Sequence, residues 1–157
     1  MTTYVKQMQR LVEEYRLSGL AWPTSAKSIA DWAITSGRWE LPAAAIRRRC
    51  ADDIAAAMRE EYMTDRKGRR VRLLHPAPLE SDGQTEMVWD DIRTAPRDHM
   101  QISFQHRRKG IVGDCRQMKV DVDSYNDAHL DAEPIQIVFD FTMDLAELEA
   151  AEEAEAA

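Results

Sequence analysis

The side chains best suited to chemistry in this sequence are two groups of cations. Three consecutive arginines, Arg47, Arg48 and Arg49, form the first group. The second places five cations within seven residues, namely Arg66, Lys67, Arg69, Arg70 and Arg72. A guanidinium group can bond two acceptor atoms at once, so both groups are suited to binding phosphates or the edges of bases.

The net charge of −7 is unevenly divided along the chain. Residues 1–78 contain 14 Lys and Arg against 9 Asp and Glu, a net charge of +5, whereas residues 79–157 contain 7 against 19, a net charge of −12. Such an asymmetry favours nucleic-acid contact by the basic half and an acidic tail or partner surface in the other half.

Sequence patterns of common enzymes are missing. The sequence contains no glycine-rich phosphate loop, no GxSxG and no HExxH, and its four histidines do not have metal-ligand spacing with a cysteine. We therefore expect a non-enzymatic protein without a cofactor or metal. The two cysteines, Cys50 and Cys115, fall at apolar positions of helical patterns and are expected to be reduced core thiols. No apolar stretch approaches the roughly 20 residues of a membrane span, which predicts a cytoplasmic protein.

Three helices should position the first cation group. Apolar spacing predicts helices over residues 3–18 and from Thr24 or Ser25 to Ser36-Gly37, and a long alanine-rich helix over residues 43–62. The third helix has an apolar stripe, which comprises Ile46, Cys50, Ile54, Ala57 and Met58. If this stripe faces the core, the three arginines emerge on the open side of the helix.

The second cation group should lie on a β-hairpin over residues 64–74. Residues Asp65 to Gly68 are of the types that form tight turns, and the side chains of the residues after them alternate between the two faces of a strand. The ordered pattern is expected to end at the proline-rich residues 75–78, and residues 79–95 are interpreted as a linker.

Beyond the linker, a helical pattern runs from about Pro96 to Asn126. Phe104, Ile111, Met118 and Tyr125 recur at every seventh position, a spacing typical of helices that pack on other helices, either in the same domain or in a homodimer. Because glycine is unfavourable inside a helix, Gly110 and Gly113 leave open an alternative in which two helices meet near Gly110. Alternation predicts a strand over residues 135–143, and the alanine/glutamate tail at 145–157 is expected to be disordered.

The order of the N-terminal elements resembles a winged helix-turn-helix DNA-binding domain. The segments that carry the resemblance are SAKSIADWAI, TSGRWELP, AAAIRRRCADDIAAAM and TDRKGRRVR. The resemblance covers about residues 3–78 and implies a mainly α fold, with a basic module at 1–78 of three helices and a hairpin. The charge and periodicity described above predict that an acidic extension follows at 96–144, with a long helix and a short strand. The resemblance also implies a recognition helix over 43–62 in the major groove of DNA and a wing over 64–74 on the backbone. Lys27 and Arg38, near the turn between helices, would contact phosphates.

Other interpretations stay open. The nucleic acid could be RNA, or the basic face could be solvated or contact the acidic half of the chain. The protein could instead be an adaptor that binds partners through the C-terminal helix and residues 135–141; the candidate contacts are Phe104, Ile111, Met118, Val122, Gln136, Phe139 and Phe141. Residues 136–141 resemble the short peptides by which bacterial replication proteins bind the sliding clamp. The stretch GDCRQMKVDVDSYND with PIQIVFDF resembles bacterial or phage-encoded proteins, which implies no function.

Overall fold

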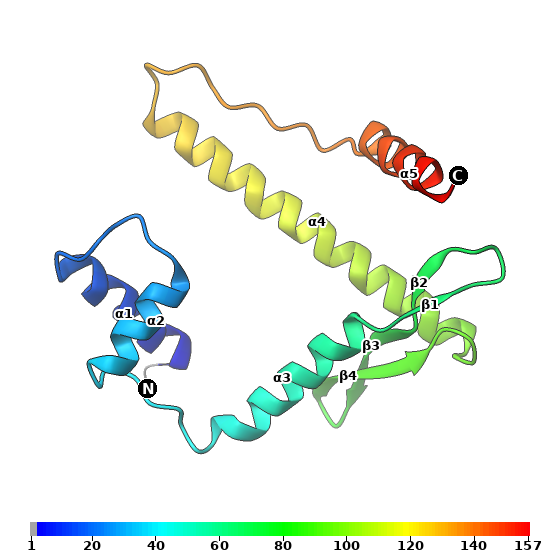
Figure 1. The fold of residues 1–157 in the computed structure, drawn as a ribbon, viewed down its shortest axis with the longest axis horizontal. Coiled ribbons are helices and arrows are strands. Elements are labelled where there is room, and N and C mark those ends of the chain that lie inside the picture. The colour runs from blue at the N-terminus through cyan, green and yellow to red at the C-terminus, as the bar shows by residue number, and fades with distance from the viewer. Residues whose placement is uncertain (1–2) are drawn as a thin grey trace. The chain divides into compact units, whose positions relative to one another are not determined.

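The computed structural model describes residues 3–157 and is mainly helical in this part of the chain (Figure 1). The chain divides into two compact units, residues 1–57 and residues 58–157, with the boundary in the last turn of the third helix. The elements in chain order are α1 (Tyr4–Leu17), α2 (Ala26–Thr35), α3 (Ala45–Arg59), β1 (Tyr62–Thr64), β2 (Arg70–Arg72), β3 (Leu74–Ser81), β4 (Gln84–Asp91), α4 (Arg97–Ala128) and α5 (Thr142–Ala156).

Helices α1 and α2 begin and end close to the predicted residues. The side chain of Ser25 accepts a hydrogen bond from the backbone N–H of Ser28 at 3.1 Å, which caps the start of α2 as predicted. The two helices pack through Tyr15, which is buried and meets the ring of Trp32 edge to face at 5.4 Å. The Tyr15 hydroxyl also donates to the backbone oxygen of Ala21 at 3.2 Å, so this ring ties the loop after α1 to the core of the first unit.

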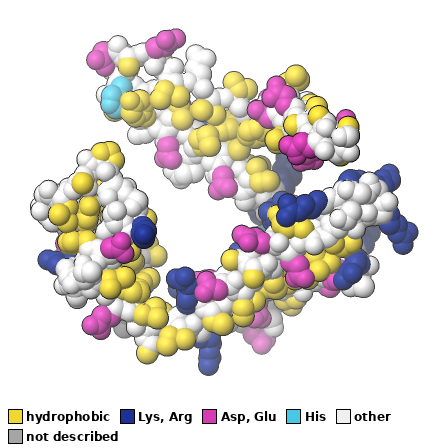
Figure 2. All heavy atoms as spheres, viewed as in Figure 1, with side chains coloured by type: hydrophobic (Ala, Val, Ile, Leu, Met, Phe, Trp, Pro, Cys, Tyr) yellow, Lys and Arg dark blue, Asp and Glu magenta, His cyan; other side chains and the backbone are white. Residues whose placement is uncertain are grey.

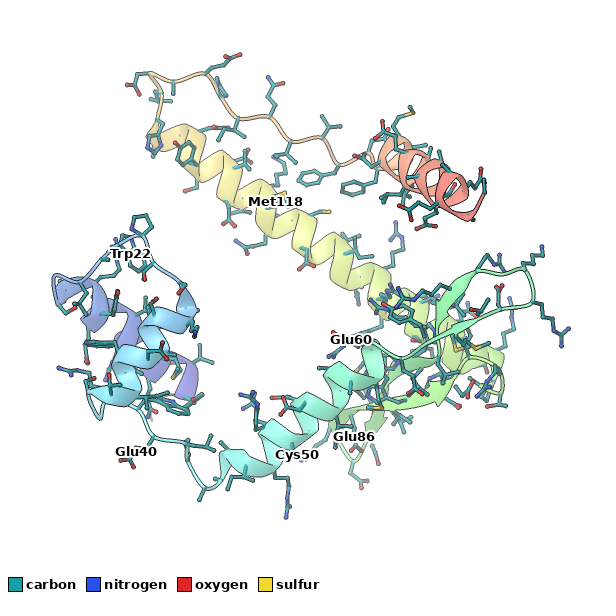
Figure 3. All side chains as sticks on the ribbon, in the orientation of Figure 1. Trp22, Glu40, Cys50, Glu60, Glu86 and Met118 are labelled. Carbon is teal, nitrogen blue, oxygen red and sulfur yellow. The ribbon has the colours of Figure 1, made fainter. Side chains whose placement is uncertain are left out.

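Helix α3 is shorter than the predicted range of 43–62, because residues 43–44 form a turn and β1 begins at Tyr62. The expectation that its apolar stripe faces a core is wrong. Ile46 and Ile54 are 59% and 53% exposed, and Cys50 is exposed as well, so Cys50 is a free thiol but not a core one (Figure 3). Alanine-rich sequence favours the helix locally whether or not a partner covers its apolar side.

The predicted basic hairpin is confirmed. Strands β1 and β2 pair antiparallel, with Met63 opposite Val71, and the turn between them contains Gly68 at a φ of +79°. Residue Leu73 then joins this hairpin to the next sheet: its N–H donates to Glu61 O, and its own oxygen accepts from the N–H of Ile92, both at 2.9 Å.

The linker predicted over residues 79–95 is instead largely a second hairpin, in which β3 and β4 pair antiparallel along eight residues each. Asp82 and Gly83 have φ values of +48° and +75°, the two positive angles of the tight turn that Asp-Gly favours. The ordered pattern also continues through Pro76 and Pro78. These prolines are two residues apart, so the N–H groups they lack would both point to the same edge of β3, which leaves the other edge free to pair with β4.

Helix α4 is one continuous helix of 32 residues, so the alternative of two helices near Gly110 is wrong. Its first turns dock on β3. Nε2 of His99 donates to the backbone oxygen of His75 at 2.9 Å, and Ser103 Oγ donates to the backbone oxygen of Pro76 at 2.6 Å. Ser103, His75 and Ala77 are buried and form the core of the second unit.

The C-terminal segment differs from both predictions made for it. Residues 135–141 are extended but do not pair with a strand; instead Asn126 on α4 exchanges two hydrogen bonds of 2.9 Å with the backbone of Ile135. The tail predicted to be disordered belongs to α5, none of whose residues is buried. Alanine and glutamate favour helix intrinsically, which accounts for α5 without a packed face.

Because the Ser103 hydroxyl is buried and bonded to Pro76, we expect Ser103→Ala to destabilise the docking of α4 on β3 by about 1–2 kcal/mol. Hydrogen exchange of the amides in the first turns of α4 measures this loss. Ser124→Ala, at an exposed position of the same helix, is the control. Equal protection in the wild type and Ser103→Ala would show that the hydrogen bond does not hold the helix.

Candidate nucleic-acid interface

The three arginines at the start of α3 are all exposed, but they do not share one face. At about 100° per residue, Arg48 points away from the apolar stripe, whereas Arg47 lies between Ile54 and Met58 in projection down the helix axis. Arg49 lies just beyond the Ile46 edge of the stripe, where its Nε is 3.1 Å from Oδ1 of Asp53, and both residues line the same open groove as Cys50. The expectation that all three emerge opposite the stripe is therefore wrong for Arg47 and Arg49, and it holds for Arg48.

The two cations predicted to contact phosphates near the turn differ in their surroundings. Lys27 is exposed in the first turn of α2. Arg38 is already used within the first unit, because its Nε is 3.4 Å from Glu14 Oε2 and its guanidinium lies 4.9 Å from the centre of the Trp32 ring. Arg38 thus links α1 to the end of α2, and a phosphate would have to displace Glu14.

The turn of the β1–β2 hairpin is organised by Asp65. Its Oδ1 accepts hydrogen bonds from the backbone N–H groups of Lys67 and Arg69, both at 2.9 Å, and its Oδ2 lies 2.7 Å from Arg69 Nε. These bonds lower the pKa of Asp65 below its usual value of 3.8, with the Arg69 backbone N–H as the largest cause and the Arg69 guanidinium next. The turn leaves Arg66 and Lys67 exposed at its tip.

The remaining hairpin cations lie on β2. The guanidinium of Arg70 stacks 4.0 Å from the centre of the Tyr62 ring on the paired strand, and Arg72 is half-buried at the end of the strand. Lys and Arg side chains gather over this hairpin in the surface view (Figure 2). The hairpin therefore presents a mostly cationic surface in which only Arg69 is paired with a carboxylate.

Two cations near Arg72 were not among the predicted site residues. Arg59 ends α3 and lies 5.6 Å from the centre of the Trp89 ring on β4, and Arg107 lies on α4. The sequence signal for Arg107 is the basic run from His106 to Lys109, which fits a polar break in the apolar seam somewhat better than a nucleic-acid contact. Trp89 lies within residues 79–95, which were interpreted as a linker, so the sequence did not indicate an aromatic partner for Arg59.

The predicted partner-binding residues lie on α4 and on the extended segment that follows it. Ile111 and Met118 are 53% and 47% exposed, and hydrophobic side chains follow α4 in Figure 2. Phe104 is partly used within the unit, since its ring meets His75 edge to face at 5.6 Å. The others lie around the junction with the extended segment, where Val122 is half-buried and Gln136, Phe139 and Phe141 are exposed.

Among residues 3–157, no group of three or more His, Cys, Asp or Glu side chains is arranged to hold a metal ion. None of the described helices has both the length and the apolar character that crossing a bilayer requires. Comparison of the chain with protein-family models, with curated proteins and with solved structures finds no match.

Because the folded-state pKa of Asp65 is lowered, its contribution to the hairpin is fully present above the ordinary carboxyl pKa and is lost as the pH falls through the folded-state pKa. We expect the amides of Lys67 and Arg69 to keep their protection from exchange at neutral pH and to lose it below pH 3.8. Carboxyl NMR shifts and amide exchange measured against pH test this. In Asp65→Asn the acid-dependent step should be gone, and an Asp65 midpoint at or above 3.8 would contradict the turn geometry.

Proposed function

We propose that this protein binds nucleic acid, most readily duplex DNA, without catalysing a reaction, in the manner of a winged helix-turn-helix protein. The observation that supports this best is the set of exposed cations without a carboxylate partner. Arg47 and Arg48 on α3 and Arg66 and Lys67 at the hairpin tip have no carboxylate oxygen of residues 3–157 within 4.0 Å of their side-chain nitrogens. Unpaired cations can neutralise phosphates without first losing an internal ion pair.

The two groups have different roles in this proposal. Arg48, and Arg47 beside it, can reach base edges from the first turns of α3, where a bidentate bond to guanine is worth about 1–3 kcal/mol of discrimination. Arg66 and Lys67 bind backbone phosphates from the hairpin tip, with Arg70 and Arg72 behind them. Arg49, Arg69 and Arg38 contribute less than their charge suggests, because a phosphate would have to compete with Asp53, Asp65 and Glu14 respectively.

The unpaired cations should determine the salt dependence of binding. We expect affinity for a short DNA duplex to fall steeply with added salt, and each phosphate contact to contribute about 0.9 to the slope of log K against log salt. We expect two double variants, Arg47→Gln/Arg48→Gln and Arg66→Gln/Lys67→Gln, each to lower this slope by the amount that corresponds to one or two phosphate contacts. Fluorescence anisotropy over a range of salt concentrations measures these slopes.

A matched control is Lys6→Gln/Arg10→Gln, which removes the same charge from exposed positions of α1. Its slope should stay close to that of the wild type. The proposal fails if the wild-type protein does not bind duplex at low salt, or if the control variant loses as much affinity as the α3 and hairpin variants. In the second case only net charge matters.

A second candidate function is an interaction protein that pairs with its own copy through α4. The supporting observation is that the apolar seam of α4, defined as Phe104, Ile111, Met118 and Tyr125, is about half exposed along its whole length. A 32-residue helix spans about 48 Å, and only its first turns dock on β3. The same seven-residue spacing on a second copy would cover the rest of the seam.

For this candidate we expect wild-type protein to dimerise between micromolar and millimolar concentrations, and Ile111→Asp and Met118→Asp to be monomeric, because each introduces a charge into an apolar interface. Light scattering coupled to size-exclusion chromatography measures the mass. Ser124→Asp introduces the same charge off the seam and should leave the dimer intact. Wild-type protein that stays monomeric throughout this range excludes the α4 interface.

A further inference from the structure

A small cavity in the second unit is lined by cations from three different elements. Its volume is about 190 Å³, and its lining includes Arg59 from the end of α3, Arg72 from β2 and Arg107 from α4, with His106 beside Arg107. The wall is completed by Trp89 and neighbouring apolar side chains, and no Asp or Glu lines it. We call this cavity the arginine pocket.

The fold positions these cations before any ligand is present. The guanidinium of Arg59 lies over the Trp89 ring at 5.6 Å. Arg72 ends β2, and its backbone oxygen accepts a hydrogen bond of 2.8 Å from Nε2 of the buried His75. Arg107 lies one helical turn after Ser103, whose bond to Pro76 fixes α4 on the sheet. The pocket therefore depends on the docking of α4 on β3.

Two of the other polar groups in the lining already have hydrogen-bond partners. Ser103 Oγ donates to one backbone oxygen and His75 Nε2 to another, so neither hydrogen is free for a ligand. None of the three arginines forms an ion pair within residues 3–157. Like charges gathered at one cavity repel one another, and an anion bound among them would remove that repulsion.

We propose that the arginine pocket binds a phosphate group. Guanidinium forks bond phosphate oxygens in pairs, and three of them match the several oxygens of one phosphate. The cavity is smaller than the roughly 300–1,000 Å³ of pockets that enclose a whole drug-sized ligand, so it suits one phosphate whose attached group remains outside. That phosphate belongs either to a nucleic-acid strand or to a free phosphorylated metabolite. The pocket does not depend on the function proposed above, because it would bind a small phosphate anion in the absence of DNA.

Calorimetric titration of the full chain with pyrophosphate tests the pocket directly. We expect saturable binding by the wild type that weakens about tenfold or more in Arg107→Gln, the loss of one charge-assisted contact. Arg107→Lys, which keeps the charge, should retain most of the affinity. Arg116→Gln removes the same charge from an exposed position of the same helix outside the pocket and should bind like the wild type.

Binding that is absent in the wild type at millimolar pyrophosphate, or that weakens equally in Arg107→Gln and Arg116→Gln, overturns the proposal. Because Arg107 is exposed, its substitution should leave the amide protection of α4 unchanged, and this measurement separates lost binding from lost folding. Single-stranded oligonucleotides with and without a 5′-phosphate identify the source of the phosphate. Loss of oligonucleotide affinity in Arg107→Gln supports a nucleic-acid phosphate, whereas unchanged oligonucleotide affinity with lost pyrophosphate binding supports a free phosphorylated metabolite.

Discussion

The contact between α4 and β3 is the interaction on which the second unit depends. Ser103 and His99 donate to consecutive backbone oxygens of β3, and the same strand pairs with β4 along its length. This arrangement fixes Arg107 on the sheet that also carries Trp89, and so forms the arginine pocket. It involves only the first turns of α4, which leaves the later part of its apolar seam without cover from the sheet. One docking contact thus accounts for a cationic pocket and an exposed apolar surface on the same helix.

Charge alone does not identify the cations that can bind a ligand, because local carboxylates neutralise some of them. Arg49 is paired with Asp53 one helical turn away, and Arg69 is paired with the Asp65 carboxylate that also closes its turn. Exposed ion pairs of this kind contribute little stability, so their main consequence is to reduce the charge available to a phosphate. Of the ten cations that the sequence predicts, Arg38, Arg49 and Arg69 are paired within residues 3–157, and the other seven remain available to a ligand.

Prediction from the sequence succeeded for elements whose signals lie in neighbouring residues. It failed for features that depend on how residues distant in the sequence pack together. Capping at Ser25, the Asp65–Gly68 turn and the helical pattern of α4 each follow from neighbouring residues, and each is confirmed, whereas the packing of α4 on another helix stays a prediction. The Asp82-Gly83 turn is also a local signal, but it lies in the polar stretch that was interpreted as a linker after the prolines, although the alternate spacing of these prolines is compatible with a strand paired on one edge. The exposure of the α3 stripe and the gathering of Arg59, Arg72 and Arg107 could not be predicted, because both depend on which elements pack together.

In the proposed function, the unpaired cations, rather than all basic residues, contact nucleic acid. The most direct test is NMR of the arginine side-chain Nε–H groups in the full-length chain, titrated with a short DNA duplex at low salt. We expect saturable shifts at Arg47, Arg48 and Arg66, with smaller changes at the carboxylate-paired Arg49 and Arg69. Shifts spread equally over all arginines, or an unchanged spectrum at saturating duplex, would contradict the proposed function.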